Sequence, residues 1–395
     1  MIEPNGRAIP DAARLLPKLD GLRDLIESSA DANEQASRLS DEVLSALEQA
    51  ELFKIMAPRA VGGMEAHPLH VIEALRKLSY FDGSTGWYCQ AAVTGPAVAG
   101  AFLGDRAIEE IFCSGGRATC AGQAAPTGKA EKVGDGYRIS GTFSFGSGTP
   151  NAAWIVGGYI LYDRGVPVLR ENGQPIMLIA FVPRSNVEFL GNWDVLGLRG
   201  TGSYDFKVLD QLIHRDFAFD AGNPEQKRGG SLYRMGFMAI PCLSHSGFAL
   251  GCTRRALDEW ADYACKKKRL PAGTVSEMET YQKELALAHA RLRSADAYVR
   301  GTFESLYAAA EQGHIPDDLK LDVRLCASNV ISAGAQISQL ALTASATTSL
   351  RNGSKIQRCF RDLQAGNAHV MTGEQSFIGA GRYLAGIDKM AFPGT

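Results

Sequence analysis

The amino-acid sequence predicts an α+β protein with three parts: a helical N-terminal domain, a central β-sandwich or β-barrel domain, and a C-terminal four-helix bundle. Two observations predict it. The spacing of apolar residues changes from helical to alternating near residue 118, and helical spacing returns after the polar stretch 223–230. A chain of 395 residues is long enough for two or three domains. We place their boundaries at 1–116, 117–222 and 223–395.

Helical spacing marks the first domain. It extends over residues 11–52, is interrupted at Pro58 and Gly62, and returns over 69–80 and 85–103. The segment 85–103 has apolar or small residues on every side, so we expect this helix to be buried.

Strand-like patterns fill the central domain. Residues alternate between apolar and polar over 137–145 and 204–208, and short apolar runs cover 154–161 and 176–182. The polar segment 163–175 contains Gly and Pro, so it predicts a hairpin loop.

The C-terminal third predicts long helices separated by short Gly- and Pro-containing breaks. We expect them at 231–268, 276–311, 317–349 and 355–386. Four long helices with short connections are typical of an antiparallel bundle.

Composition excludes several classes of protein. Lys and Arg number 41 against 43 Asp and Glu, a formal net charge of −2, so a nucleic-acid-binding surface is not expected. No apolar run approaches the roughly 18–20 residues of a membrane helix, and the start lacks a signal-peptide pattern, so we expect a cytoplasmic protein. The eight Cys form no CxxC pair, and Glu65, His67 and His70 lack the HExxH spacing, so no metal site is predicted.

A glycine-flanked serine ends the first predicted strand. In the segment 141–148, Gly146 and Gly148 on either side of Ser147 would let a ligand approach the hydroxyl closely, and Phe145 could support a flat ring. The alternative is a strand-end turn in which the serine makes only local hydrogen bonds.

A second glycine-rich segment covers residues 196–203. Arg199, Thr201 and the exposed N–H groups that glycines allow could bind an anion such as a phosphate. The alternative is a tight β-turn with an exposed arginine.

The third segment surrounds His369 in the predicted last helix. Small residues one turn away, Ala365, Gly366, Thr372 and Gly373, would leave room for a ligand beside the imidazole. A neutral histidine there could act as a base or a hydrogen-bond donor. The alternative is a core histidine with a satisfied hydrogen bond.

The order of these segments resembles the acyl-CoA dehydrogenase fold superfamily. The resemblance covers about residues 20–390 and is strongest at Leu52–Pro58, Leu196–Ser203, Ala249–Gly251 and Arg361–Asp362. It implies the same three-part fold, a flavin bound between the parts, and a homotetramer.

The catalytic carboxylate of the dehydrogenases is missing. Most members carry a Glu eight residues after the Asp of the Arg-Asp pair, where this chain has Val370, and 235–257 contains no Asp or Glu. The Arg of that family's phosphate site corresponds to Lys267.

Three segments instead resemble the oxygenase components of two-component flavin-dependent monooxygenases, such as the p-hydroxyphenylacetate and secosteroid-phenol hydroxylases and the dibenzothiophene monooxygenases. They are Asp82–Trp87, Phe143–Gly148 and Arg361–His369. In that family the serine lies near flavin N5 and the histidine lines the active site, which implies catalytic roles for Ser147 and His369.

The resemblance implies a reduced-flavin-dependent monooxygenase. A separate NAD(P)H:flavin reductase would supply reduced FMN or FAD, O2 would add at flavin C4a, and the hydroperoxide would transfer one oxygen atom to an aromatic, heteroaromatic or amine substrate. Beside the catalytic pair, the expected contacts are Ala121, Gly122, Gln123, Phe145, Arg199, Thr201 and Lys267 to the flavin, and Trp87, Tyr88 and His245 to the substrate.

Some alternatives remain open. The phenol hydroxylases usually carry a further histidine after the Gly-Trp pair, where this chain offers only Tyr88, Gln90 or Thr94. A flavin dehydrogenase or oxidase acting on an acyl thioester is a second hypothesis. A non-catalytic flavin-fold protein acting through tetramer assembly is a third.

Overall fold

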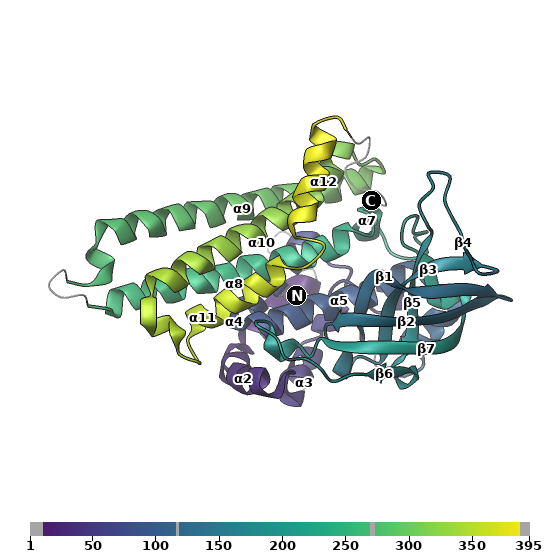
Figure 1. The fold of residues 1–395 in the computed structure, drawn as a ribbon, viewed down its shortest axis with the longest axis horizontal. Helices are drawn as coiled ribbons and strands as arrows, with labels where there is room; N and C mark the ends of the chain where they lie inside the picture. Colours follow the sequence, from purple (N-terminus) through teal and green to yellow (C-terminus); the bar gives the residue numbers. More distant parts are fainter. Residues whose placement is uncertain (1–10, 116–117, 269–272, 388–395) are drawn as a thin grey trace, which may run out of the picture.

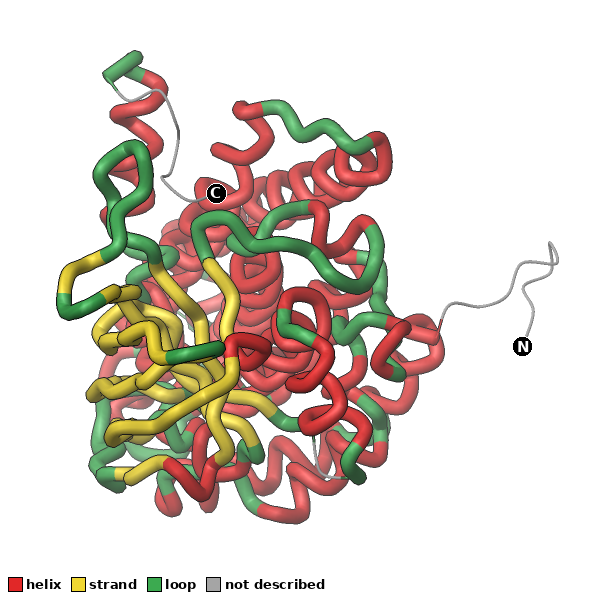
Figure 2. The backbone as a smooth tube through the Cα atoms, turned by 90° about the vertical axis from the view of Figure 1, so that its right-hand side faces the viewer, coloured by secondary structure: helices red, strands yellow, loops and turns green. Residues whose placement is uncertain are grey.

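Helices come first along the chain, strands follow, and helices return, in the order that the sequence predicts (Figure 1). The structure is a computed structural model that describes residues 11–115, 118–268 and 273–387. The strands gather at one end of the helical body in Figure 1, and Figure 2, which looks onto that end, shows them in front of helices. The domain boundaries stay predictions, and residues 116 and 117, at the first of them, lie outside the described residues.

Three helices replace the single helical stretch predicted over residues 11–52. The chain turns at Gly21, and Ser37 adopts a left-handed conformation with φ of 54°, so the pattern is broken twice. Ser40 then caps the third helix by accepting a hydrogen bond from Val43 N–H. The helices of this part are α1 (Asp11–Asp20), α2 (Arg23–Ala36), α3 (Asp41–Gln49), α4 (Pro68–Phe81), α5 (Gly83–Phe102) and α6 (Asp105–Ile108).

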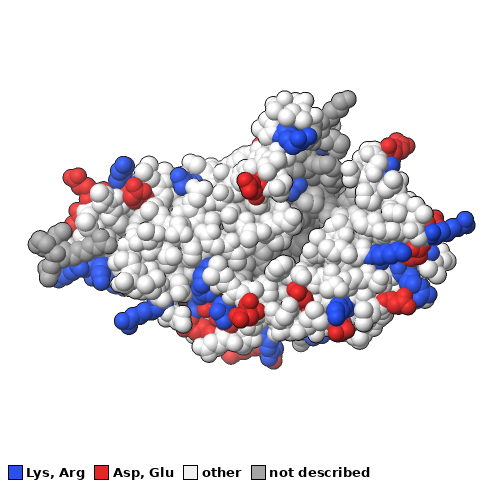
Figure 3. Space-filling model, in the orientation of Figure 1, with Lys and Arg blue, Asp and Glu red and all other residues white. Residues whose placement is uncertain are grey.

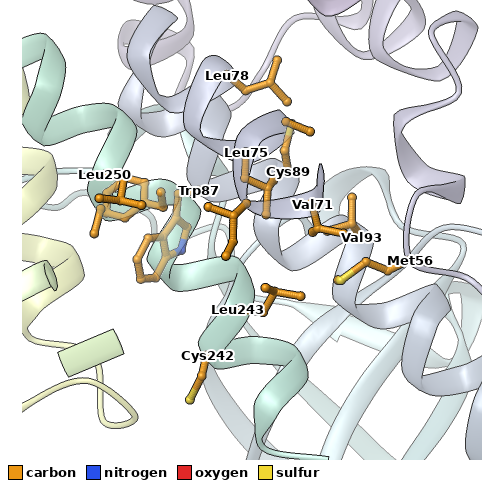
Figure 4. Close-up of a cluster of buried hydrophobic side chains, with 14 of the residues drawn as sticks. Met56, Val71, Leu75, Leu78, Trp87, Cys89, Val93, Cys242, Leu243 and Leu250 are labelled. Atoms are coloured by element: carbon orange, nitrogen blue, oxygen red, sulfur yellow. The ribbon is translucent and has the colours of Figure 1, made fainter. Parts of the chain in front are cut away.

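The helix α5 is almost completely buried, as its sequence predicts. Its N-terminus is capped by the Asp82 carboxylate, which accepts from Thr85 N–H at 2.8 Å. Glycine lets it approach its neighbours closely, because a Cβ at Gly86 would lie 2.0 Å from Ser79 Oγ on α4. Figure 4 shows Trp87 of α5 near Leu250 of α8, with Leu243 further along the same helix.

The strands form one mixed sheet, where we expected a β-sandwich or a β-barrel. Its order is β6-β7-β2-β1-β3-β5-β8, with β4 beside β3, and only β1 and β3 among these pairs run parallel. The strands are β1 (Cys120–Val133), β2 (Gly136–Gly146), β3 (Trp154–Asp163), β4 (Val166–Pro167), β5 (Met177–Pro183), β6 (Val187–Phe189), β7 (Tyr204–His214) and β8 (Ala218–Asp220).

The strand β1 was not predicted, and the expected flavin contacts Ala121, Gly122 and Gln123 lie at its beginning. Its sequence is rich in Gly, Ala, Lys and Glu, which have low strand propensity, so the alternating pattern is weak. It nevertheless pairs with β2 and β3 in the middle of the sheet. Next to it, Phe143 lies between Tyr159 and Phe206 with ring centroids 5.3 and 5.0 Å away, in a core that belongs to the sheet alone.

The C-terminal part is a bundle of α8, α9, α10 and α11 (Figure 1). Two of the four predicted helices are broken. Gly236, with φ of 96°, separates α7 from α8, and residues 368–373 separate α11 from α12. The helices are α7 (Ser231–Arg234), α8 (Ala239–Lys266), α9 (Glu279–Gln312), α10 (Asp317–Ala344), α11 (Lys355–Asn367) and α12 (Glu374–Leu384).

The three parts meet at the buried carboxyl group of Asp362 on α11. Its Oδ1 accepts a hydrogen bond from Leu198 N–H at 2.6 Å, and its Oδ2 lies against Gly83 at the start of α5. Gly197 lies so close to the backbone of Arg361 that a Cβ would be 2.0 Å from the Arg361 carbonyl oxygen. The glycines of the segment 196–203 are therefore explained in part by packing.

No helix in the described ranges is both long and apolar enough to cross a membrane.

Two glycine-to-alanine variants test the close packing of helices. Gly251→Ala on α8 places a methyl group 2.1 Å from the Arg76 carbonyl oxygen, so we expect it to lower the free energy of unfolding by about 1–3 kcal/mol. Gly301→Ala on α9 meets nothing within 4 Å and should raise it by about 0.5–1 kcal/mol. Chemical denaturation measures both, and equal effects of the two variants would contradict the packing argument.

The Asp362 carboxyl should make stability depend on pH. Burial, and then the charge of Asp82, raises the pKa of Asp362 to about 7, against about 3.9 in the unfolded chain. The folded state therefore keeps a proton that the unfolded state loses, so this contribution is complete below about pH 4 and is lost as the pH rises through 7. Asp362→Asn retains the acceptor for Leu198 N–H. It should remove the decrease in stability that the wild type shows as the pH rises through 7.

Unfolding of the wild type and Asp362→Asn between pH 4 and 8 measures this contribution. Asp210→Asn, at an exposed ion pair with Arg138, is the matched control. A wild-type slope that persists in Asp362→Asn would show that another group carries it.

Candidate functional site

Residues from all three parts of the chain meet around Ser147. Trp87 comes from α5, Gly122 from β1 and His369 from the connection after α11. The Trp87 indole N–H donates to Ser147 Oγ at 3.0 Å, and Gly122 forms a β-bridge with Ser147. The Trp87 ring also lies 5.6 Å from the ring of His369, edge to face. The predicted catalytic pair is thus connected through Trp87.

The hydroxyl of Ser147 is a hydrogen-bond acceptor on two sides. Besides Trp87, Ser203 donates to its Oγ at 2.8 Å. Ser203 Oγ lies 2.7 Å from Thr201 Oγ1. Thr201 Oγ1 in turn donates to the Leu198 carbonyl oxygen at 2.8 Å. A hydroxyl oxygen has two lone pairs and one proton, so the two donors leave the Ser147 proton available. With Ser203 as the donor, the Ser147 proton bonds neither Trp87 nor Ser203.

The turn before Ser147 is strained. Phe145 has φ of 64°, which is rare for an aromatic residue, and its side chain is 66% exposed. Asp205 Oδ1 holds the turn by accepting from Phe145 N–H at 3.1 Å. Backbone strain of this kind persists where the surroundings impose it, and it is common at ligand sites. An exposed ring beside Ser147 agrees with the predicted support for a flat ligand.

The start of β1 provides a second edge for such a ligand. A Cβ at Gly122 would lie 2.0 Å from the Val156 carbonyl oxygen, so only glycine fits there. The next side chain, Gln123, has a buried Oε1 without a hydrogen-bond partner in the described part of the chain. An unmet acceptor next to a spare hydroxyl proton fits the polar edge of a flavin, which carries both donors and acceptors. The residues present therefore fit a flavin.

On the other side of Trp87 lies a cluster of aromatic side chains. His245 and Phe248 come from α8 and contact the Trp87 ring with centroids at 5.1 and 4.9 Å. The rings of His245 and His369 are themselves 4.7 Å apart. The substrate candidates Trp87 and His245 and the catalytic candidate His369 thus form one group.

Hydrogen bonds assign opposite tautomers to the two histidines. His245 Nδ1 is 2.7 Å from the Pro241 carbonyl oxygen, which can only accept, so Nδ1 carries the proton and Nε2 is a bare acceptor. Met371 N–H donates to His369 Nδ1 at 3.3 Å, so in the neutral ring the His369 proton is on Nε2. Burial lowers the pKa of His245 to about 4, and burial together with His245 lowers the pKa of His369 to about 3. Both rings are neutral near pH 7.

The predicted helical surroundings of His369 are wrong. The helix α11 ends at Asn367, and His369 lies in the turns before α12, with its N–H donating to the Gly366 carbonyl oxygen at 3.1 Å. The small residues matter for a different reason, because a Cβ at Gly366 would lie 3.1 Å from the Trp87 ring. Ending the helix there turns the next residue, Val370, to a 67% exposed position.

A hollow lies between the sheet and the helical bundle (Figure 3). The β1–β2 side of the sheet and the connection from α11 to α12 lie on either side of it (Figure 1). Ser147 follows β2 and His369 follows α11, so both predicted catalytic residues belong to the segments that border this hollow.

Tyr88 and Ala121 also lie near the turn at Ser147. A Cβ at Gly148 would lie 3.2 Å from the Tyr88 ring and 3.4 Å from Ala121 Cβ. Tyr88 in addition lines a separate cavity of about 590 Å³ with Phe53 and Arg184. Thr94, expected as a possible wall of the site, bonds Ser244 Oγ and the Gln90 carbonyl oxygen instead.

Lys267, one of the predicted flavin contacts, lies far from this site along α8. Arg199 is half exposed, and its nearest carboxylate is Asp194 at 3.9 Å. Lys267 follows the far end of α8: it is 22 residues after His245 (267 − 245), or about 33 Å of helix. The chain by itself therefore does not bring Lys267 to this site.

Ser203 was missed as a site residue. It lies in the segment 196–203 that the resemblance identified, and its hydroxyl reaches Ser147 only because the chain turns at Gly202. Its position two residues after Thr201, a predicted flavin contact, was the sequence signal that could have identified it.

The chain resembles known proteins over almost its entire length. Residues 243–374 match the family described as acyl-CoA dehydrogenase, C-terminal domain. Indole-3-acetate monooxygenase of Pseudomonas putida is 29% identical over 384 residues, covering 95% of this chain and 94% of that protein. The oxygenase subunit HsaA, a flavin-dependent monooxygenase of Mycobacterium tuberculosis, is 29% identical over 393 residues, covering 95% and 96%.

The crystal structure of the HsaA monooxygenase from M. tuberculosis superimposes with a TM-score of 0.87 at 26% identity, covering 97% of this chain and 99% of the other. These comparisons confirm the predicted resemblance to the acyl-CoA dehydrogenase fold and to the oxygenase components within it.

The pKa values of the two histidines can be tested directly. We expect the imidazole NMR signals of His245 and His369 to stay unchanged from pH 8 down to about pH 5. Because the unfolded chain protonates histidine near pH 6.5, their contribution to stability is complete above that value and is lost as the pH falls through about 4 and 3. His245→Gln and His369→Gln assign the signals, and a midpoint near 6.5 for either ring would contradict its burial.

Proposed function

We propose that this chain, a flavin-dependent monooxygenase of the oxygenase-component type, inserts one atom of O2 into an aromatic substrate bound beside Trp87 and His369. The observation that carries the proposal is the arrangement around Trp87. Its indole N–H holds Ser147 on one side, and its ring contacts two neutral histidines on the other. A flavin edge at Ser147 and an aromatic ring at the histidines would then be neighbours.

Four residues would hold the flavin. Gly122 and Gln123 would meet its polar edge, Ser147 would donate its spare proton near N5, and Phe145 would lie along the ring system. When bound, reduced flavin supplies the electrons that activate O2. FMN and FAD both remain candidates, and Arg199, Thr201 and Lys267 are the proposed contacts to the phosphate-bearing part.

The protein groups have separate tasks. Ser147 donates one hydrogen bond at a fixed position, because Trp87 and Ser203 already occupy its lone pairs. His369 would present Nε2–H, which supports the donor role of the two roles expected from the sequence. The buried rings of Trp87 and Phe248 exclude water from the reacting atoms.

The partners follow from the same proposal. A separate NAD(P)H:flavin reductase would supply the reduced flavin, since the sequence has no GxGxxG fingerprint and the relative HsaA is named as an oxygenase subunit. The proposed assembly is a homotetramer in the cytoplasm. A tetramer would also explain Lys267, which could reach the flavin of a neighbouring copy.

Isotope labelling tests the reaction. The protein is mixed with chemically reduced FMN or FAD, heavy-oxygen O2 and a series of rings: indole-3-acetate, phenol and resorcinol. We expect one labelled atom in the product of at least one ring. Ser147→Ala and His369→Ala should divert most of the oxygen to hydrogen peroxide, about a hundredfold or more in product yield, which is the usual size of losing a placed proton donor.

His289→Ala changes an exposed histidine on α9 and serves as the control. Recovery of all oxygen as hydrogen peroxide with every ring would contradict the proposal. Bleaching of bound oxidised FAD by an acyl-CoA without oxygen would support the dehydrogenase alternative in its place.

A further inference from the structure

His245 Nε2 is one of the buried side-chain atoms that lack a hydrogen-bond partner in the described residues. The residue is 3% exposed, and Nε2 is buried without a hydrogen-bond partner in the described residues. The tautomer set by Pro241 makes this nitrogen an acceptor, and a buried acceptor without a donor costs free energy. Neighbouring side chains do not remove that cost, since the described contacts of the ring are to Trp87 and to His369, 4.7 Å away.

The position of this nitrogen points to a ligand and away from a purely structural role. A structural histidine on an apolar helix usually has both ring nitrogens satisfied, by backbone or by a neighbouring side chain. His245 uses only Nδ1, on its own helix. The other nitrogen belongs to a ring that contacts both Trp87 and His369, the two residues that border the proposed reaction site.

We infer that His245 Nε2 accepts a hydrogen bond from an O–H or N–H group on the substrate ring, and thereby selects phenol-like or indole-like rings over rings without a donor. The inference rests on the proposed function and adds a specificity residue to it. His245 on α8 then accepts a hydrogen bond from the substrate, and His369 after α11 donates one.

The complementary pair has a consequence for orientation. An acceptor on one side and a donor on the other can hold a ring whose substituents include both an O–H or N–H and a second oxygen atom. Because burial keeps His245 neutral, the acceptor is available over the ordinary pH range. A site with a buried acceptor also rejects a ring that lacks the donor, since the nitrogen would stay unpaired.

Binding of a matched pair of rings tests the inference. Indole and benzofuran have nearly the same shape, and benzofuran replaces the N–H by an oxygen atom. Calorimetry with the full-length protein and FMN should show indole binding about tenfold or more tightly than benzofuran, which is the usual cost of leaving a buried polar group unpaired. His245→Leu should reduce that ratio to about one, while His245→Gln, which retains an acceptor, should keep it above the ratio of the Leu variant.

Ser246→Ala is the matched control, because the Ser246 hydroxyl bonds the Cys242 carbonyl oxygen within α8. We expect it to keep the wild-type ratio. A wild-type protein that binds indole and benzofuran equally overturns the inference without any variant, and so does an unchanged ratio in His245→Leu. If the wild type binds indole and oxygenates it without this preference, the proposed function stands and only the role of His245 fails. If it neither binds nor oxygenates any of the rings, both fail.

Discussion

The hydrogen bond from Leu198 N–H to the buried carboxyl group of Asp362 is the contact on which the site depends. It joins the segment 196–203 to α11, and the same carboxyl lies against the start of α5. From Leu198 the hydroxyls of Thr201 and Ser203 lead to Ser147, and from α5 the indole of Trp87 reaches Ser147 from the other side. A shift at this junction would therefore move both donors to Ser147.

Among the described residues, two buried acceptors lack a hydrogen-bond partner, Oε1 of Gln123 and Nε2 of His245, and the two donors to Ser147 leave its own proton for a third group. Such atoms cost free energy in an empty site, and a bound ligand with matching groups recovers it. Two of these groups border the sheet and one lies on α8, so the proposed flavin and substrate ring would account for them together.

Much of this could be predicted from the sequence. The period of apolar residues gave the order of helices and strands, because burial of one face is a local property of the chain. Short motifs gave Ser147, Trp87 and His369, and the missing carboxylate at Val370 separated the oxygenases from the dehydrogenases. The strand β1 was not predicted because Gly, Ala and Lys carry no strand preference of their own. Its pairing is imposed by β2 and β3.

The sequence by itself determined the order of helices, strands and helices, the enzyme class and most of the residues around Ser147, since these follow from local patterns and short motifs. Only the tertiary structure decided that α11 stops before His369, that Lys267 lies far from Ser147, and that His245 presents a bare nitrogen beside His369. Those features depend on which helices pack together and on which backbone carbonyl oxygen a ring nitrogen meets. Such contacts join residues that are distant along the chain, so no local pattern records them.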